Sequence, residues 1–321
     1  MNEYIKIFED YLKEEIKYNK PANLYDPVKY ILDSGGKRLR PLITLYISDL
    51  FNGNKVNALP AAAAIEIFHN FTLAHDDIMD NSSLRRGKKT INAKWDDNTG
   101  ILSGDVMLII SYEILNKYED SKYILLSKKL TEVSRLVCEG QQADIDFSSK
   151  NGITENEYFE MIKNKTAVLI GCSFMFGGIA AETNTLNTDL LYKIGLNLGI
   201  AFQLEDDLLD CFGDQEKFGK KIGGDILQKK KTLLYLFTYS ELESEKKLEF
   251  ENIFNSNEIE ESKKINSIKS FYETSGALEY LKNKVRVYFN EAEMLIDKLE
   301  LNNDTKKKLN LFCKTLLNRE I

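Results

Sequence analysis

The sequence has 321 residues and a formal net charge of −7 at pH 7, and 43% of its residues are hydrophobic. A chain of this length can bury a large core, and its acidic balance argues against a nucleic-acid-binding surface. No stretch approaches the roughly 18 uncharged apolar residues of a transmembrane helix, and the N-terminal residues lack the apolar stretch of a signal peptide. The four cysteines form no C-x-x-C pair, so we expect free thiols in a cytoplasmic protein.

Helices are predicted along the whole chain. No proline follows Pro60, and apolar residues recur at helical intervals, as at Leu190, Ile194 and Leu198. Polar or glycine-containing breaks separate helix-sized segments at residues 52–54, 81–83, 148–152, 184–187, 211–214 and 255–257. We therefore expect a single all-α domain over residues 1–321, built as a helical bundle around a central cavity.

The first candidate site in chain order is residues 35–41, which read Gly-Gly-Lys-Arg-Leu-Arg-Pro. The two glycines predict a turn that ends the second helical segment, and a turn beside basic residues is common without any function. Lys37 and Arg40 are three residues apart and could converge on one anion.

An apolar run from Leu59 to Met79 ends on a group of aspartates. Pro60 and the alanines after it predict the start of a helix. On that helix Asp76 and Asp80 project from one face about 6 Å apart, and two arginines follow. A solvated acidic helix end is the simpler interpretation of one such motif. Carboxylates that can hold Mg²⁺ beside guanidinium groups that can hold phosphate instead suggest a diphosphate site.

The same Asp-Asp-x-x-Asp pattern recurs at residues 206–210, again at the end of an apolar segment and before a basic, glycine-rich stretch at residues 218–225. Two copies at the ends of apolar helices are difficult to explain as surface charge. We expect the two motifs to face each other across the cavity and to bring six carboxylates to its mouth.

Seven short motifs occur in an order and spacing that resemble the trans-isoprenyl diphosphate synthases, also called polyprenyl synthetases. They lie between about residue 30 and residue 235, and the flanking helical segments extend the resemblance to most of the chain. Each motif is weak alone, whereas seven in register are specific. The motifs are Gly35–Pro41, His69, Asp76–Asp80 with Leu84–Gly87, Gly140-Gln141-x-x-Asp144, Lys165-Thr166, Phe202-Gln203-x-x-Asp206-Asp207-x-x-Asp210, and Gly219-Lys220 with Lys230-x-Thr232.

The resemblance implies the isoprenoid synthase fold and a Mg²⁺-dependent, head-to-tail condensation of isopentenyl diphosphate with an allylic diphosphate, which releases pyrophosphate. It assigns isopentenyl diphosphate to Gly36, Lys37, Arg40, His69 and Arg86. It gives catalytic roles at the allylic diphosphate and the developing cation to Asp76, Asp80, Arg85, Lys165, Thr166, Gln203, Asp206, Lys220 and Lys230. Lys221, Lys229 and Lys231 are adjacent alternatives to the last two lysines.

The metal ligands that the resemblance implies are Asp76, Asp77, Asp80, Asp206, Asp207 and Asp210. Three Mg²⁺ are expected per site, two on the first motif and one on the second. We interpret Asp144 as a carboxylate near the first metal cluster that does not bind the metal directly, and Asp105 as a structural residue.

Product length in the family depends on a bulky residue five positions before the first aspartate, which is Phe71 here. Phe68 lies about one turn deeper, and one turn of helix spans about one isoprene unit. Both rings could instead simply pack against neighbouring helices. Thr72 is small, unlike the paired aromatics of some short-chain members. We therefore expect a C20 product, geranylgeranyl diphosphate, with C15 farnesyl diphosphate as the alternative.

Two alternative functions would show different sequence features from those of a condensing enzyme. A class I terpene cyclase shares one aspartate motif but would lack the residue 35–41 motif. A non-catalytic subunit of a heteromeric synthase would typically have eroded aspartates, whereas all six are present here. We also expect a homodimer, which is usual in the family.

Overall fold

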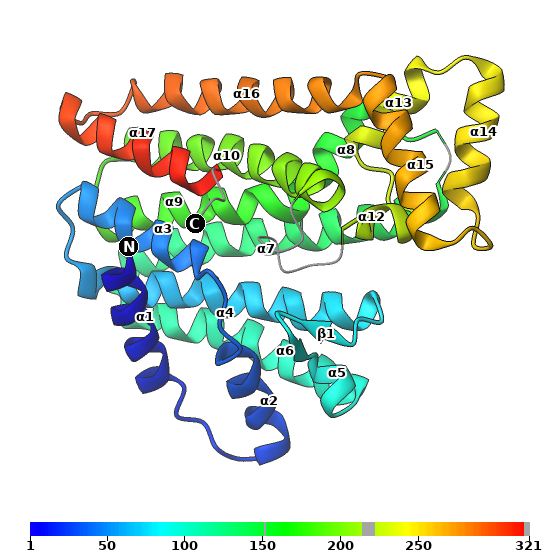
Figure 1. Cartoon of the computed structure of the whole chain (residues 1–321). Coiled ribbons are helices and arrows are strands. Elements are labelled where there is room, and N and C mark those ends of the chain that lie inside the picture. Colours follow the sequence, from blue (N-terminus) through cyan, green and yellow to red (C-terminus); the bar gives the residue numbers. More distant parts are fainter. Residues whose placement is uncertain (151, 214–221, 318–321) are drawn as a thin grey trace. The chain divides into compact units, whose positions relative to one another are not determined.

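The computed structural model describes residues 1–150, 152–213 and 222–317 (Figure 1). Its regular structure is helical apart from one two-stranded hairpin, so the predicted all-α class is confirmed. The elements are α1 Asn2–Glu15, α2 Ala22–Leu32, α3 Leu39–Leu50, α4 Lys55–Met79, β1 Leu84–Arg85, β2 Lys88–Lys89, α5 Ile91–Lys94, α6 Asp97–Glu113, the 3₁₀ helix η1 Ile114–Lys117, α7 Asp120–Ser149, α8 Glu155–Ile162, the π-helical turn η2 Lys163–Ala167, α9 Val168–Ala180, α10 Thr185–Phe212, α12 Gly224–Leu227, α13 Leu233–Glu241, α14 Ser244–Asn255, α15 Glu261–Thr274, α16 Ala277–Ile296 and α17 Asn303–Leu317.

The chain divides into two compact units. The first consists of Met1–Glu132 and Cys172–Tyr192, and the second of Val133–Gly171 and Lys193–Ile321. The long helices α7, α9 and α10 contribute residues to both. The prediction of a single domain over residues 1–321 stays a prediction.

Helix α4 is the core of the first unit, where it packs against α3 and α6. It begins at Lys55 and not at Pro60, because the Asn54 side chain accepts a hydrogen bond of 2.9 Å from the Val56 N–H and caps the helix. Pro60 therefore lies inside the helix, where it costs one backbone hydrogen bond. The four alanines that follow it are fully buried, and their small side chains let neighbouring helices approach α4 closely.

The two arginines after the first aspartate motif lie in a hairpin directly beyond α4 (Figure 1). Leu84 pairs with Lys89 and Arg85 with Lys88, which leaves Arg86 and Gly87 as a two-residue turn. Both turn residues have positive φ, 53° and 74°, as in a type I′ turn. The side chain of Arg85 therefore projects from a strand and that of Arg86 from a turn.

Helix α8, the turn η2 and helix α9 form one continuous run from Glu155 to Ala180. The run begins at Glu155 because Thr154 and Glu157 form a capping box. Its middle, Lys163–Ala167, is a π-helical turn, a feature that occurs frequently at functional sites.

Glycines on two other helices lie directly against this turn. A Cβ on Gly140 of α7 would lie 2.2 Å from the backbone nitrogen of Lys165, and one on Gly199 of α10 would lie 2.5 Å from the Cα of Ala167. Any side chain at either position would collide with main chain, which cannot move aside as the end of a flexible side chain can. The close approach of the three helices therefore requires glycine at both positions.

An aromatic core lies at the other end of this unit. Tyr235 of α13 contacts Phe250 and Phe254 of α14, with ring centroids 5.2 and 4.5 Å away. Helix α16 packs against α13 and α15 (Figure 1).

Within residues 1–150, 152–213 and 222–317, no helix is long and apolar enough to cross a membrane.

Candidate functional site

Both aspartate motifs lie at the C-terminal ends of long helices. Asp76 and Asp77 are in the last turn of α4 and Asp80 is its C-cap residue, while the second motif lies near the end of α10. The C-terminal end of a helix carries a partial negative charge and normally favours lysine or arginine. In these two helices, which are described to their ends, the last turn carries no basic residue. Carboxylates and helix dipoles thus combine to attract a cation at each motif.

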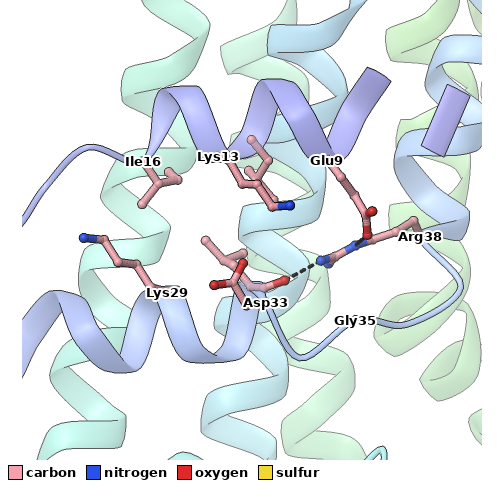
Figure 2. Close-up of a pocket in the computed structure, with 9 residues that line it drawn as sticks. Glu9, Lys13, Ile16, Lys29, Asp33, Gly35 and Arg38 are labelled. Carbon is pink, nitrogen blue, oxygen red and sulfur yellow. Dashed lines mark hydrogen bonds and ion pairs between the residues drawn. The ribbon is translucent and has the colours of Figure 1, made fainter. Parts of the chain in front are cut away.

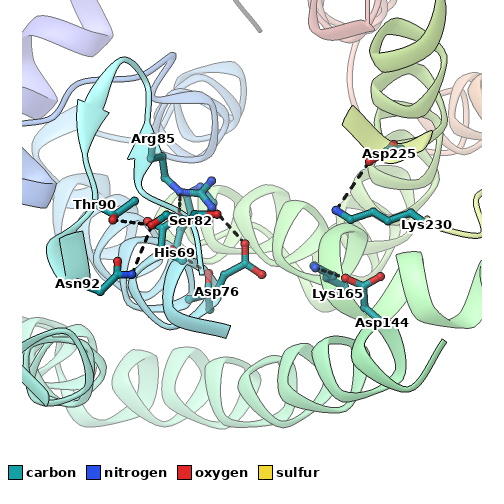
Figure 3. A network of polar contacts seen from close by, with 12 residues as sticks. His69, Asp76, Ser82, Arg85, Thr90, Asn92, Asp144, Lys165, Asp225 and Lys230 are labelled. Carbon is teal, nitrogen blue, oxygen red and sulfur yellow. Dashed lines mark hydrogen bonds and ion pairs between the residues drawn. The ribbon is translucent and has the colours of Figure 1, made fainter. Parts of the chain in front are cut away.

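The first motif holds Arg85 of the hairpin. Arg85 donates from Nε to the Asp77 carboxylate at 2.7 Å and from an Nη atom to Asp76 at 3.2 Å (Figure 3). Asp77 is only 2% exposed, whereas Asp80 is exposed. Burial raises the pKa of the Asp77 carboxyl, and the Arg85 guanidinium partly offsets that shift.

In the second motif, as in the first, the middle aspartate is buried. Asp207 is 4% exposed, and its two carboxylate oxygens accept hydrogen bonds from the Tyr158 hydroxyl at 2.5 Å and from the Gln203 amide at 3.0 Å. Burial and the nearby Asp225 raise the pKa of Asp207 well above its usual value. Thr166 in turn donates to the amide oxygen of Gln203 at 3.0 Å. Asp207 therefore orients the amide of Gln203, the residue that the family resemblance assigns to the developing cation.

The π-helical turn presents Lys165 and Thr166 from adjacent positions. Lys165 forms an ion pair of 2.5 Å with Asp144, one turn after Gln141 on α7 (Figure 3). The structure thus places two pairs, Lys165–Asp144 and Thr166–Gln203, at one turn of the second unit.

Of the three neighbouring lysines 229–231, Lys230 is the one near the second motif. Its Nζ lies 3.7 Å from the Asp225 carboxylate, and the Asp225 backbone N–H donates to Asp210 at 2.9 Å. Lys229 instead donates to the Asn255 carbonyl, and Lys231 donates to the Lys150 carbonyl. These contacts favour Lys230 for the predicted role. Lys220 and its alternative Lys221 lie outside the described residues.

The residues predicted to bind isopentenyl diphosphate come together in the first unit. Arg40 lies 3.1 Å from the His69 ring, measured from Nη1 to Nε2. The Arg86 guanidinium donates to the Gly35 carbonyl, and a Cβ on Gly36 would lie 2.5 Å from its Cζ. Gly36 also has a φ of 122°, so its backbone conformation requires glycine, and the missing side chain leaves room for the Arg86 guanidinium. Lys37 is exposed on the same loop.

His69 is neutral near pH 7. Burial lowers the pKa of its imidazole well below the usual 6.5, and the nearby charge of Arg40 lowers it further. A neutral ring can share a proton with a diphosphate without adding to the repulsion among the arginines. In the unfolded chain, by contrast, the ring takes up a proton near its ordinary pKa.

The stability of the protein should therefore depend on pH through His69. Below about pH 6.5 the unfolded state binds more protons than the folded state, so the free energy of unfolding should fall by up to about 1.4 kcal/mol per pH unit. Chemical denaturation of the wild type and of His69→Gln at pH 7.5 and 5.5 measures this. The variant should lose less stability on acidification, and an equal loss in both proteins would contradict the assignment.

Sequence reasoning missed the role of Arg38, which anchors the loop that carries Lys37. Arg38 is 4% exposed and has a φ of 46°. Its guanidinium donates to Glu66 of α4 at 2.8 Å and to the carbonyl of Leu32 at the end of α2, and its Nε lies 3.6 Å from Glu9 of α1 (Figure 2). A basic residue within a basic motif gives no signal that it points inward.

Arg38 also forms one end of a cavity of about 620 Å³ between α1 and α2. The cavity has an apolar wall, and acidic and basic side chains alternate around it (Figure 2). Its lining residues are Glu9, Leu12, Lys13, Ile16, Lys29, Leu32, Asp33, Gly35 and Arg38. Three basic and two acidic side chains line the cavity, and Gly35 and Arg38 of the loop form part of its wall.

Comparison with known proteins identifies the family. The model of the family described as "Polyprenyl synthetase" matches residues 21–272. The chain belongs to the polyprenyl synthetase family. A geranylgeranyl diphosphate synthase of Methanosarcina mazei is 34% identical over 90% of this chain and 87% of its own length. One from Saccharolobus solfataricus is 44% identical over 68% of each chain.

Solved structures agree with this assignment to the polyprenyl synthetases. A crystal structure of a geranylgeranyl pyrophosphate synthase superposes with a TM-score of 0.95 and 42% identity, covering 100% of this chain and 99% of that one. The predicted isoprenoid synthase fold is therefore confirmed. The predicted roles of individual residues stay predictions.

The donor set of the two motifs suits a hard divalent cation. Mg²⁺ prefers oxygen ligands and usually takes one or two carboxylates, completing its shell with water and substrate phosphate. Among the residues that the structure describes, no group of three or more His, Cys, Asp and Glu is arranged as a ready metal cage.

Proposed function

We propose that this polyprenyl synthetase condenses isopentenyl diphosphate with allylic diphosphates and that its product is the C20 compound geranylgeranyl diphosphate. The observation that carries the proposal is the separation of two cationic groups in the first unit. Arg85 lies on the aspartate motif, whereas Arg40 lies with His69. A terpene cyclase has one diphosphate to bind and no use for the second group, so this arrangement favours condensation.

The reaction follows from the chemistry of these groups. The allylic C–O bond breaks and its electron pair leaves with pyrophosphate, the isopentenyl double bond forms the new C–C bond, and loss of a proton restores an alkene. Lys165 and Lys230 offset the charge of the leaving group. Thr166 and Gln203 offer neutral oxygens, which stabilise a cation without capturing it. We assign the proton to the departing pyrophosphate.

A divalent metal, when bound, neutralises diphosphate charge and draws electrons from the breaking bond. In this chain Asp76 and Asp80 would hold it at the first motif, and Asp206 with Asp210 at the second. We assign the buried Asp77 and Asp207 mainly to holding Arg85 and Gln203. The expectation that both motifs serve one diphosphate through three Mg²⁺ stays a prediction.

The C20 product is supported by two aromatic rings on α4 and by the names of the relatives. The Phe68 and Phe71 rings lie 5.4 Å apart, and both are buried. Phe71 is five residues before Asp76, where a large side chain would stop the growing chain. A C15 product would place that stop closer to the aspartates.

The proposed function can be tested with purified protein, Mg²⁺, isopentenyl diphosphate and allylic primers from C5 to C15. Pyrophosphate release above an EDTA control is expected, with C20 as the main product. Absence of release for every primer would reject the enzyme and favour a non-catalytic subunit. A main product of C15 would reject only the product assignment.

Arg40→Ala should separate the two substrates kinetically. The variant loses the proposed charge-assisted hydrogen bond between the Arg40 guanidinium and the diphosphate group. This loss should raise the KM for isopentenyl diphosphate by about 10- to 100-fold. The KM for the allylic diphosphate should stay nearly unchanged. Arg135→Ala, which removes an exposed arginine from α7, is the matched control. A rise in the allylic KM alone would show that Arg40 binds the other substrate.

We also propose that the protein is a homodimer. In the first unit, α6 and the start of α7 expose five large apolar side chains, which is more than scattered surface residues would give. These are Ile101, Leu102, Ile109, Ile124 and Leu125, between 43% and 63% exposed. A second copy of the chain would cover them, and sedimentation at micromolar concentration should give a dimer.

The cytoplasmic location stays a prediction.

A further inference from the structure

The predicted floor of the product site contains a third ring. His75 lies one turn after Phe71 on the same side of α4, and the two ring centroids are 4.9 Å apart at an interplanar angle of 71°. Such edge-to-face pairs contribute about 0.5–1.5 kcal/mol. A continuous row of ring contacts thus runs along α4 through Phe68, Phe71 and His75. His75 is the member of this row nearest to the aspartates.

His75 is fixed from the side of α6. Its Nε2 lies 3.0 Å from the Ile101 carbonyl oxygen and 3.8 Å from the Asp105 carboxylate. A Cβ on Gly104 would lie 2.2 Å from the same Nε2 and 2.4 Å from the neighbouring ring carbon. The imidazole therefore rests directly on the backbone of α6, and it has room there only because residue 104 has no side chain.

We propose that His75, seated on Gly104, determines product length by supporting the Phe71 ring from the α6 side. The inference rests on the proposed function. Without the imidazole, the Phe71 ring can turn into the space toward α6, which deepens the path of the growing chain. A methyl group on residue 104 instead displaces the imidazole toward Phe71 and makes that path shallower. The two changes act on product length with opposite signs.

Four variants test this: His75→Ala, Gly104→Ala, Phe71→Ala and Gly100→Ala. Gly100 lies one turn before Gly104 on α6. Its added Cβ would come within 3 Å of only the flexible end of Ile78, at 2.7 Å, and would meet the Asn92 backbone nitrogen at an ordinary contact distance of 3.9 Å. It is the matched control for an added methyl group on this helix. Each protein is assayed at a fixed ratio of isopentenyl diphosphate to primer for total pyrophosphate and for the amounts of C15, C20 and C25 products.

His75→Ala and Phe71→Ala should raise the ratio of C25 to C20, and Gly104→Ala should raise the ratio of C15 to C20. The expected change is about 2- to 12-fold, which corresponds to the energy of one ring contact. Gly100→Ala should keep the wild-type distribution. Product ratios are measured on the molecules that turn over, so partial loss of folded protein does not alter them. His75→Gln, which keeps a donor for the Ile101 carbonyl but lacks the ring, should also lengthen the product.

Unchanged ratios in His75→Ala and Gly104→Ala would overturn the proposal, as would shifts of the same sign in both. An unchanged ratio in Phe71→Ala would overturn it as well, because the ring that His75 supports would then not be the floor. These outcomes differ from failure of the proposed function, in which the wild type itself releases no pyrophosphate.

Discussion

Replacing Asp76 or Asp206 with alanine is expected to lower kcat for pyrophosphate release by about 10²-fold or more, because each change removes a predicted ligand of the metal that neutralises the leaving pyrophosphate. Each residue belongs to a motif at the C-terminal end of a helix, where the partial negative charge of the helix adds to the attraction for a cation. The Mg²⁺ concentration for half-maximal rate should rise as well. A steady-state assay across a Mg²⁺ titration measures both effects.

Asp189→Ala provides the matched control, since Asp189 is an exposed aspartate on α10, the helix that carries Asp206. It should leave kcat and the Mg²⁺ dependence unchanged. If Asp76→Ala or Asp206→Ala retained kcat within about twofold of the wild type at saturating Mg²⁺, that motif would not act on the breaking bond.

Gly140→Ala should lower both kcat and stability. The added methyl group would lie 2.2 Å from the backbone nitrogen of Lys165 and would push α7 away from the π-helical turn. Overpacking of this kind costs about 1–3 kcal/mol of folding free energy. The displaced turn carries Lys165 and Thr166. A shift of these side chains by about 1 Å should lower kcat by a further factor of about 10². Thermal unfolding and steady-state kinetics separate the two effects.

Gly177→Ala makes the same type of collision elsewhere, because its Cβ would lie 2.6 Å from the Thr44 carbonyl oxygen in the first unit. It should destabilise the protein to a similar extent without the selective loss of kcat. Equal kcat values in the two variants would show that the geometry of the turn is not important for the reaction.

The sequence was sufficient to predict features that depend on local pattern. The apolar run before Asp76 is a buried helix. The break predicted at residues 52–54 lies between α3 and α4, the one at 81–83 separates α4 from the hairpin, and the one at 255–257 coincides with the end of α14. Helix α4 starts five residues before Pro60, the predicted start signal, because Asn54 caps it. The hairpin at Arg86 and Gly87 could have been found, since a glycine after a polar residue between two short strands is a turn signal.

Other features depend on segments that are far apart in the sequence. The π-helical turn lies between Gly140 and Gly199, and the periodicity of residues 155–180 does not reveal it. The choice among Lys229, Lys230 and Lys231 depends on which carbonyl or carboxylate each one reaches in the folded chain. Likewise, the inward direction of Arg38 is decided by the buried Glu66, 28 residues away.

The anchoring of Arg38 has a consequence for shortened forms of the protein. The family match begins at residue 21, so a fragment cut to that boundary would lack α1 entirely. Yet α1 supplies Glu9 and Leu12 to the wall around Arg38, and without them one side of the buried Arg38–Glu66 pair would open to water. The loop would then lose the packing that supports it, although the fragment would keep every residue predicted to bind substrate. The first helix therefore belongs to the working enzyme, although it lies outside the region by which the family is recognised.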